Sequence, residues 1–236
     1  MNVGRIQNDL RRFIARHQIQ FDHLASSEPQ ILEISALAVA TTHYERNQYK
    51  VLPENLKRGT FRVKVKSGYR ENFSWFQVAR EQAFEVHANL GVQSAYAADT
   101  GIYVVDVAVA RNRAVANRGP GKRDEWIAND DLVTFLEAKK LVAFPMLLAQ
   151  FVGIVHEIKP TFLSGRRPRG FLRESHFDPA LVTVGPVART AGAIRDGFKA
   201  RGFRIGIITN FDNRISWLSR NDAAASPLDA VDGDAT

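Results

Sequence analysis

The sequence predicts an α/β domain in which a mixed central β-sheet is flanked by helices. Three observations support this class. Helical patterns come first, and strand patterns follow, two of them apolar on both faces. In the last third of the chain, strand and helix patterns alternate. This order is typical of a sheet whose central strands are covered on both sides.

Two helices are predicted before the first strand. Residues 5–18 carry apolar side chains at helical spacing. Ser27 and Gln30 form a capping box that opens a second helix over residues 27–47. Glu33 lies on one stripe of that helix with Leu37, Ala40 and Tyr44.

Three strands are predicted after these helices. Residues 61–66 and 84–90 alternate between apolar and polar side chains, and residues 73–79 are rich in aromatic and β-branched types. Residues 80–82 are the expected hairpin turn. A single long helix over 73–90 is the alternative, which the β-branched and aromatic content disfavours.

The middle of the chain holds the two apolar segments, residues 102–110 and 132–138, which are predicted to be central strands. The stretch 111–131 between them contains NRGPGKRDE and is predicted to be an exposed loop. The remaining predicted elements are a helix at 144–158, a basic loop at 159–173, a strand at 181–184, a helix at 187–200 and a strand at 204–209.

Three charged residues interrupt the two central strands. Asp106 is the only charge in the first, while Glu137 and Lys139 stand two apart in the next segment and share one face of a strand. Two buried carboxylates repel each other unless a cation lies between them. Asp106 and Glu137 offer the oxygen ligands that Mg²⁺ prefers, and Lys139 can orient an attacking water. The pattern favours phosphodiester hydrolysis; a structural ion pair is the alternative.

These residues resemble the PD-(D/E)xK nuclease superfamily, which contains many restriction enzymes and repair nucleases. Asp106 lies on one strand and the Glu137-x-Lys139 pair on the next, and a helix carrying a glutamate precedes them. Val105 stands where the superfamily's name has proline. The resemblance covers about residues 30–185 and implies a restriction-endonuclease-like fold, with a mixed central β-sheet flanked by helices.

The resemblance also implies roles for further residues. Glu33 is the expected third acidic residue, with Glu85 as its substitute, and Gln150 is an expected site-facing glutamine. The implied metal ligands are Asp106, Glu137 and Glu33, and the implied cofactor is Mg²⁺, for which Mn²⁺ substitutes. The implied substrate is DNA, with RNA left open, and a homodimer would pair two active sites to cut both strands.

The charge of the chain is consistent with a polyanionic partner. There are 32 Lys and Arg against 25 Asp and Glu, a formal net charge of +7. Residues 222–236 contain four aspartates and no basic residue, so the rest of the chain is more basic than this total. Arginines in the basic loop are expected to contact phosphates, with a solvated loop as the alternative. They are Arg166, Arg167, Arg169 and Arg173.

One nuclease domain is expected over residues 1–220, with a helical extension at 1–29, a core at 30–210 and an acidic disordered tail at 221–236. The chain has no cysteine, which excludes disulfides and thiolate metal sites. No signal-peptide pattern and no apolar stretch long enough for a bilayer are present, so a cytoplasmic location away from membranes is expected.

Other function classes lack their sequence signals. There is no P-loop, GxGxxG or GxSxG, and the six histidines lack metal-ligand spacing. Glu85 and His87, the polar side of a predicted strand, are expected to face water. Two alternatives to a constitutive nuclease stay open. One is a catalytically silent nucleic-acid-binding or scaffolding module on the same fold, and the other is a nuclease that waits for a small-molecule signal.

Overall fold

The computed structural model describes residues 3–21, 28–65, 68–97, 101–119, 125–167 and 169–211. The predicted helix cap at Ser27 and the predicted acidic tail lie outside these residues. The structure is 33% helical and 32% strand, which confirms the α/β class. None of the described helices is long and apolar enough to span a lipid bilayer.

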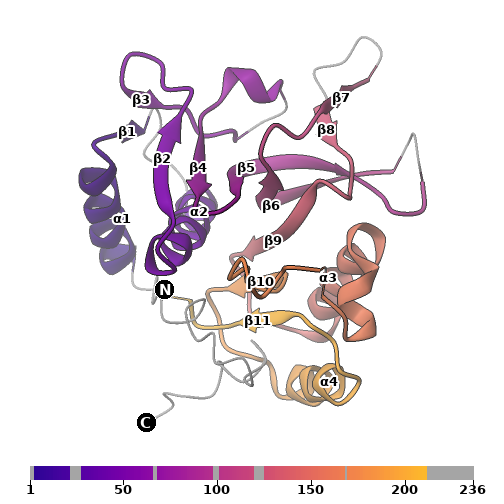
Figure 1. Ribbon diagram of the computed structural model, residues 1–236. Coiled ribbons are helices and arrows are strands. Elements are labelled where there is room, and N and C mark those ends of the chain that lie inside the picture. Colours follow the sequence, from indigo (N-terminus) through magenta and orange to yellow (C-terminus); the bar gives the residue numbers. More distant parts are fainter. Residues whose placement is uncertain are drawn as a thin grey trace.

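Two helices lie near the start of the described chain, a run of strands follows, and helices and strands alternate after β9 (Figure 1). The helices are α1 (Val3–His17), α2 (Glu28–Arg46), α3 (Pro145–Ile158) and α4 (Arg189–Ala200), with short 3-10 turns η1 (Arg70–Asn72) and η2 (Pro160–Ser164). The strands are β1 (Gln20–Phe21), β2 (Lys50–Glu54), β3 (Thr60–Phe61), β4 (Trp75–Ala79), β5 (Ala83–Gln93), β6 (Ile102–Arg111), β7 (Ala116–Arg118), β8 (Glu125–Ile127), β9 (Leu132–Lys139), β10 (Ala180–Thr183) and β11 (Gly206–Ile208).

A mixed open sheet forms the centre of the molecule, in the strand order β11-β10-β9-β6-β5-β4-β2. The β9–β10 and β10–β11 pairs are parallel, whereas the pairs from β9 across to β2 are antiparallel. β8 joins β5 in parallel, and β7 pairs with β8. β1 and β3 form a separate parallel pair.

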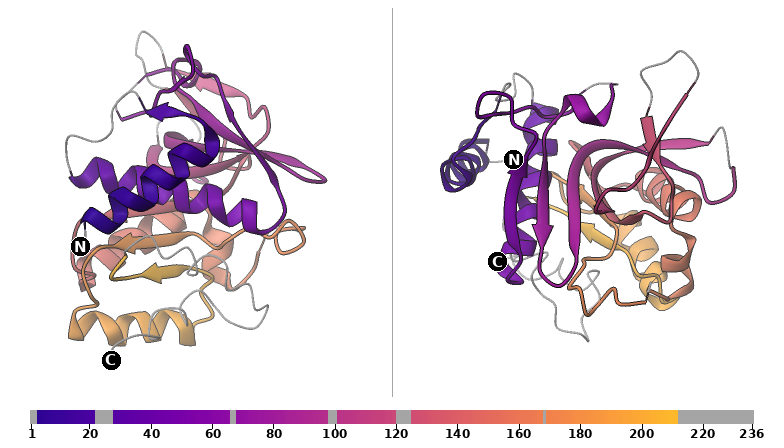
Figure 2. Two further views of the ribbon diagram at one scale, coloured as in Figure 1. Left: turned by 90° about the vertical axis from the view of Figure 1, so that its left-hand side faces the viewer. Right: turned by 45° about the horizontal axis from the view of Figure 1, so that its top comes forward.

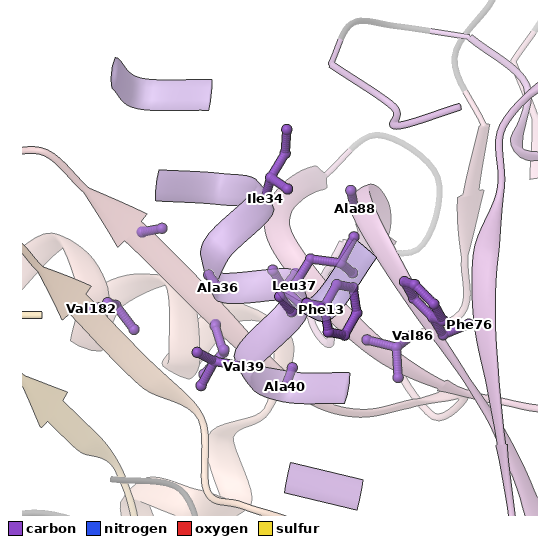
Figure 3. Packing of buried hydrophobic residues seen from close by; sticks show 14 of the residues in the cluster. Phe13, Ile34, Ala36, Leu37, Val39, Ala40, Phe76, Val86, Ala88 and Val182 are labelled. Carbon is purple, nitrogen blue, oxygen red and sulfur yellow. The ribbon is translucent and has the colours of Figure 1, made fainter. Parts of the chain in front are cut away.

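Helices cover the sheet on both sides, as the turned views in Figure 2 show. α1 and α2 pack in one hydrophobic cluster with residues of β4, β5 and β6, and Figure 3 shows Phe13 of α1 and Leu37 of α2 beside Val86 of β5. α3 and α4 pack in a second cluster, which includes Phe135 of β9 and Leu181 of β10. The central strands are therefore buried on both faces, as their apolar sequences predicted.

Two of the predicted elements differ from the structure. Within the described residues, the strand expected at 61–66 is confined to β3. The next backbone groups bind Ser74, which precedes β4, and the side chain of Asn89, and they have no continuous strand partner. The Arg62 N–H donates to Ser74 Oγ (3.0 Å), and the Lys64 carbonyl accepts from Asn89 Nδ2 (2.7 Å).

The loop expected at 111–131 contains β7 and β8, so this prediction was wrong. β8 pairs with Gly91 and Val92 of β5. A side chain at Gly91 would lie 2.5 Å from the Glu125 carbonyl oxygen, so the glycine lets β8 approach closely. The turn-forming composition of this stretch obscured two short strands that depend on a distant partner.

Candidate functional site

The candidate site lies where β5, β6 and β9 run side by side. Between β5 and β6, Ala88 pairs with Val107 and Leu90 pairs with Val105, so Asn89 and Asp106 lie between the same two pairs. Between β6 and β9, Val107 pairs with Leu136, the residues next to Asp106 and Glu137. Asp106 Oδ2 also accepts a hydrogen bond from the backbone N–H of Ala138 (2.7 Å). Asn89, Asp106 and Glu137 thus lie close together on three neighbouring strands.

Lys139 joins the two acidic residues of this group. Its Nζ lies 2.8 Å from Asp106 Oδ2 and 2.8 Å from Glu137 Oε2. The side chain of Glu137 is 4% exposed and that of Asp106 is 12% exposed, whereas Lys139 is 36% exposed. The pair of carboxylates is therefore buried, with one partly exposed ammonium group between them.

The pKa of Glu137 is shifted by its burial and by the neighbouring charges. Burial and the charge of Asp106 raise the pKa of Glu137 to about 7, and the Lys139 ammonium offsets only part of that shift. Within the described part of the chain, Glu137 Oε1 has no hydrogen-bond partner although it is buried. Burial alone would lower the pKa of Lys139, but its ion pairs with Glu137 and Asp106 raise it above its usual value. One ammonium group does not fully satisfy two buried carboxylates.

Glu33 reaches the same region from α2. Burial raises the pKa of Glu33 above its usual value, a hydrogen bond from Asn89 lowers it, and the charges of Asp106 and Lys139 act on it in opposite directions. Its carboxyl group therefore lies close enough to sense both of these charges. The structure thus brings together four of the residues that the sequence predicted at the site: Glu33, Asp106, Glu137 and Lys139.

Asn89 was missed at the sequence level. Its Nδ2 donates to Glu33 Oε2 (3.2 Å) and to the Lys64 carbonyl (2.7 Å). Its φ is 48°, a left-handed conformation that asparagine tolerates better than most residues. An asparagine on the polar side of an alternating strand carries no sequence signal that would distinguish it from a solvated one.

The acidic residues of the site offer oxygen ligands to a metal ion. Among the residues described, no group of three or more His, Cys, Asp or Glu side chains is arranged to hold a metal ion. Asp106 and Glu137 do provide two carboxylates around one cation, and Glu137 Oε1 is a buried oxygen without a partner. Because Mg²⁺ is commonly held by one or two carboxylates and keeps several waters, this pair fits Mg²⁺. A metal-binding role for Glu33 stays a prediction.

Gln150 lies elsewhere in the structure. It is exposed on α3, where it lines an open, largely apolar pocket with Tyr103 and Phe203. No hydrogen bond joins it to Asp106 or Glu137 within the described residues. The helix presents this glutamine outward because the opposite side of α3 is occupied by core residues.

Glu85 and His87 are buried, so the expectation that they face water was wrong. His87 Nε2 lies 2.8 Å from Glu85 Oε2, and Glu85 also accepts from the backbone N–H of Arg113 (3.0 Å). Trp75 packs against the His87 ring, with centroids 5.6 Å apart. Glu85 therefore belongs to a separate buried polar cluster, and it does not substitute for Glu33.

The four arginines of the basic loop have different surroundings. Arg167 forms a two-point ion pair with Asp178, at 2.7 and 2.6 Å, and Asp178 is 1% exposed. Arg173 pairs with Glu81 at the surface. Arg166 and Arg169 are exposed. Arg167 is thus held in a structural contact, which limits its availability to a phosphate.

The Arg167–Asp178 pair leads to a stability prediction. Arg167→Met should lower the free energy of unfolding by about 2 kcal/mol, because it leaves the Asp178 carboxylate buried without its partner. Chemical denaturation would measure the change. Arg166→Met, an exposed neighbour, is the matched control and should change stability by less than about 0.5 kcal/mol. Equal losses in both variants would contradict the structural role of Arg167.

Comparisons of this chain with protein-family models, with curated proteins and with solved structures gave no match.

Proposed function

We propose that this protein is a Mg²⁺-dependent endonuclease that hydrolyses phosphodiester bonds in DNA, on a restriction-endonuclease-like fold. The observation that carries the proposal is the convergence of Asp106, Glu137 and Lys139 on adjacent central strands, with the Glu33 carboxyl of α2 within electrostatic reach. The basic character of the chain supports an anionic substrate.

The burial of the site supports a catalytic role over a purely structural one. When both carboxyl groups are ionised, two carboxylates and one ammonium group leave a net negative charge among largely buried side chains. One oxygen of Glu137 also remains unpaired within the described region. Such an arrangement costs free energy in a structural core. Perturbed carboxyl pKa values are common at catalytic sites, because catalysis requires groups that are poised for charge changes.

In the proposed reaction, Asp106 and Glu137 would hold Mg²⁺, which supplies positive charge to the scissile phosphate and activates water for attack. Lys139 extends from the buried strand toward solvent, so its ammonium group can donate hydrogen bonds to the attacking water and to the phosphate oxygens. The negative charge of Glu33 would keep this region selective for cations. Burial of the carboxylates strengthens each of these interactions.

The same geometry favours a second candidate function. The Lys139 ammonium group already lies between the two carboxylates and serves as their counter-ion. A protein that kept this ion pair without binding a metal would be a nucleic-acid-binding or scaffolding module on the same fold. The two functions differ in whether a metal must enter beside Lys139.

The direct test is a cleavage assay with the full chain. Supercoiled plasmid and linear DNA would be incubated with the protein in Mg²⁺, in Mn²⁺ and in EDTA. Cleavage that requires a divalent cation supports the nuclease. DNA binding by the same preparation, measured by fluorescence anisotropy, without cleavage of DNA or RNA in either metal, would favour the binding module.

Asn89 provides a test of how Glu33 is positioned. Asn89→Gly retains the left-handed backbone but removes both hydrogen bonds of the side chain. We expect the Mg²⁺ concentration for half-maximal cleavage to rise about tenfold, because residues that orient metal-site carboxylates typically have effects of this size.

A matched control exists at Asn55. Asn55 is also left-handed (φ 55°), and its Nδ2 donates to two carbonyl groups, those of Glu71 and Phe73. Asn55→Gly should leave the Mg²⁺ requirement unchanged. A similar shift in both variants would show that the Asn89 effect arises from general loosening of the fold and not from the orientation of Glu33.

A further inference from the structure

A second polar site lies at the opposite end of β9 from the candidate active site. A cavity of about 150 Å³ is bordered by the first residues of β9, Leu132 and Val133, by the end of β6 and by the loop after η2. Glu137 is five residues further along β9, which corresponds to about 16 Å at the usual rise of a strand. The cavity is therefore separate from the group of Asn89, Asp106 and Glu137.

Basic side chains from three parts of the chain surround this cavity. Arg111 comes from β6, Lys159 from the C-terminal end of α3, and Arg169 and Arg173 from the basic loop. Within the part of the chain that the structure describes, the side chains of Arg111, Lys159 and Arg169 make no hydrogen bond or ion pair. Arg173 is paired with Glu81.

Two acidic residues also border the cavity, and they do not neutralise it. The Glu174 carboxylate accepts a hydrogen bond from Tyr49 (2.9 Å) and faces Arg80 at 4.0 Å, so its charge is already compensated. Asp130 acts on Lys159 only at longer range, because the described residues include no ion pair between them. Arg111, Lys159 and Arg169 carry three positive charges, against Asp130 in the lining and Asp131 just outside it, so the cavity keeps a net positive charge.

Lys159 shows that this positive charge is not fully solvated. Burial lowers the pKa of Lys159 to about 8, and the charge of Arg111 lowers it as well, while Asp130 and Asp131 partly offset these effects. A partly buried ammonium group without a close partner is costly, and a bound anion would remove that cost.

We propose that this cavity binds a small phosphate-bearing ligand, held by Lys159, Arg111 and Arg169. The cavity volume suits a phosphate group, and guanidinium and ammonium groups are the usual donors to phosphate oxygens. A single phosphate group could come from a small molecule or from a nucleic-acid backbone. The recessed shape of the cavity and its position away from the candidate active site favour a small molecule.

The test is isothermal titration calorimetry of the full chain with sodium phosphate, against sodium chloride at equal ionic strength. We expect saturable binding of one phosphate with a Kd of about 1 mM or tighter. Lys159→Met and Arg111→Met should each weaken this binding at least about tenfold. Lys57→Met, which removes an exposed cation from the loop between β2 and β3, should leave it unchanged.

Thermal unfolding of each variant without phosphate would establish that it folds. Arg111 is exposed, so Arg111→Met keeps the proposal testable if Lys159→Met fails to fold. Adenosine 5′-monophosphate and duplex DNA in EDTA would then identify the source of the phosphate group. Displacement of phosphate by the nucleotide but not by DNA supports the proposal. Three results would overturn the proposal. They are the absence of saturable phosphate binding, undiminished phosphate binding by both variants, and displacement of phosphate by DNA that depends on Lys159.

Discussion

Glu137→Gln should lower cleavage of DNA by at least about 100-fold while the protein remains folded. The substitution keeps the volume of the side chain but removes one of the two carboxylates that surround the Lys139 ammonium group. Because loss of a single electrostatic group at a phosphoryl-transfer or acyl-transfer site costs about 100-fold to 1,000-fold in rate, an effect of this size is expected. Asp106→Asn and Lys139→Met should have effects of the same order.

Initial cleavage rates of a linear duplex in saturating Mg²⁺ would measure these losses, and circular dichroism would verify folding. Two surface substitutions provide matched controls. Asp196→Asn removes a carboxylate that is 68% exposed on α4, and Lys57→Met removes an exposed ammonium group. Both should retain the rate of the unsubstituted protein. Cleavage that survives Glu137→Gln and Lys139→Met would exclude this site as the catalytic one.

The free energy of unfolding of the metal-free protein should contain a pH-dependent contribution from Glu137 of about 3 kcal/mol. The pKa of Glu137 in the folded protein is about 7, above its ordinary value of 4.5, because burial and Asp106 disfavour its ionised form. The folded protein therefore binds this proton more tightly than the unfolded chain does. The resulting stability is fully present below about pH 4.5 and is lost as the pH rises through about 7.

Chemical denaturation in EDTA, at several values between about pH 4.5 and about pH 7.5, would measure this contribution as the difference between the protein and Glu137→Gln. The comparison matters because other carboxyl groups titrate too. Burial raises the pKa of Glu33 despite the hydrogen bond from Asn89, whereas the hydrogen bond from His87 lowers the pKa of Glu85 despite its burial. If the free energies of unfolding of the two proteins changed in parallel with pH, the raised pKa of Glu137 would be contradicted. Addition of Mg²⁺ at about pH 7.5 should stabilise the protein but not the variant, since the variant lacks the carboxylate.

The two central strands illustrate what a sequence pattern carries. Asp106, Glu137 and Lys139 were identifiable because each interrupts an apolar stretch, and a buried charge requires a partner nearby. The structure then showed which partner each has. The pattern contained no information on the distance between the two strands, because that distance depends on the pairing of residues about 30 positions apart.

The surroundings of Asn89 and Glu85 could not be predicted from the sequence pattern. Both lie on the polar side of one alternating strand, and the same pattern fits side chains that face solvent. In the structure, Asn89 binds Glu33 of α2, and Glu85 is covered by residues that include Arg70 of η1. Covering segments of this kind come from distant parts of the chain and leave no periodic signal in the strand itself.

The sequence by itself determined the α/β class, the limits of most helices and strands, and the three charges of the central strands. These features follow from local periodicity and from the cost of burying a charge, which act within one element. The tertiary structure alone decided that Asn89 holds Glu33, that Arg167 is engaged by Asp178, and that Arg111, Lys159 and Arg169 surround one cavity. Each of these depends on contacts between elements, which form only when the chain folds and brings distant residues together.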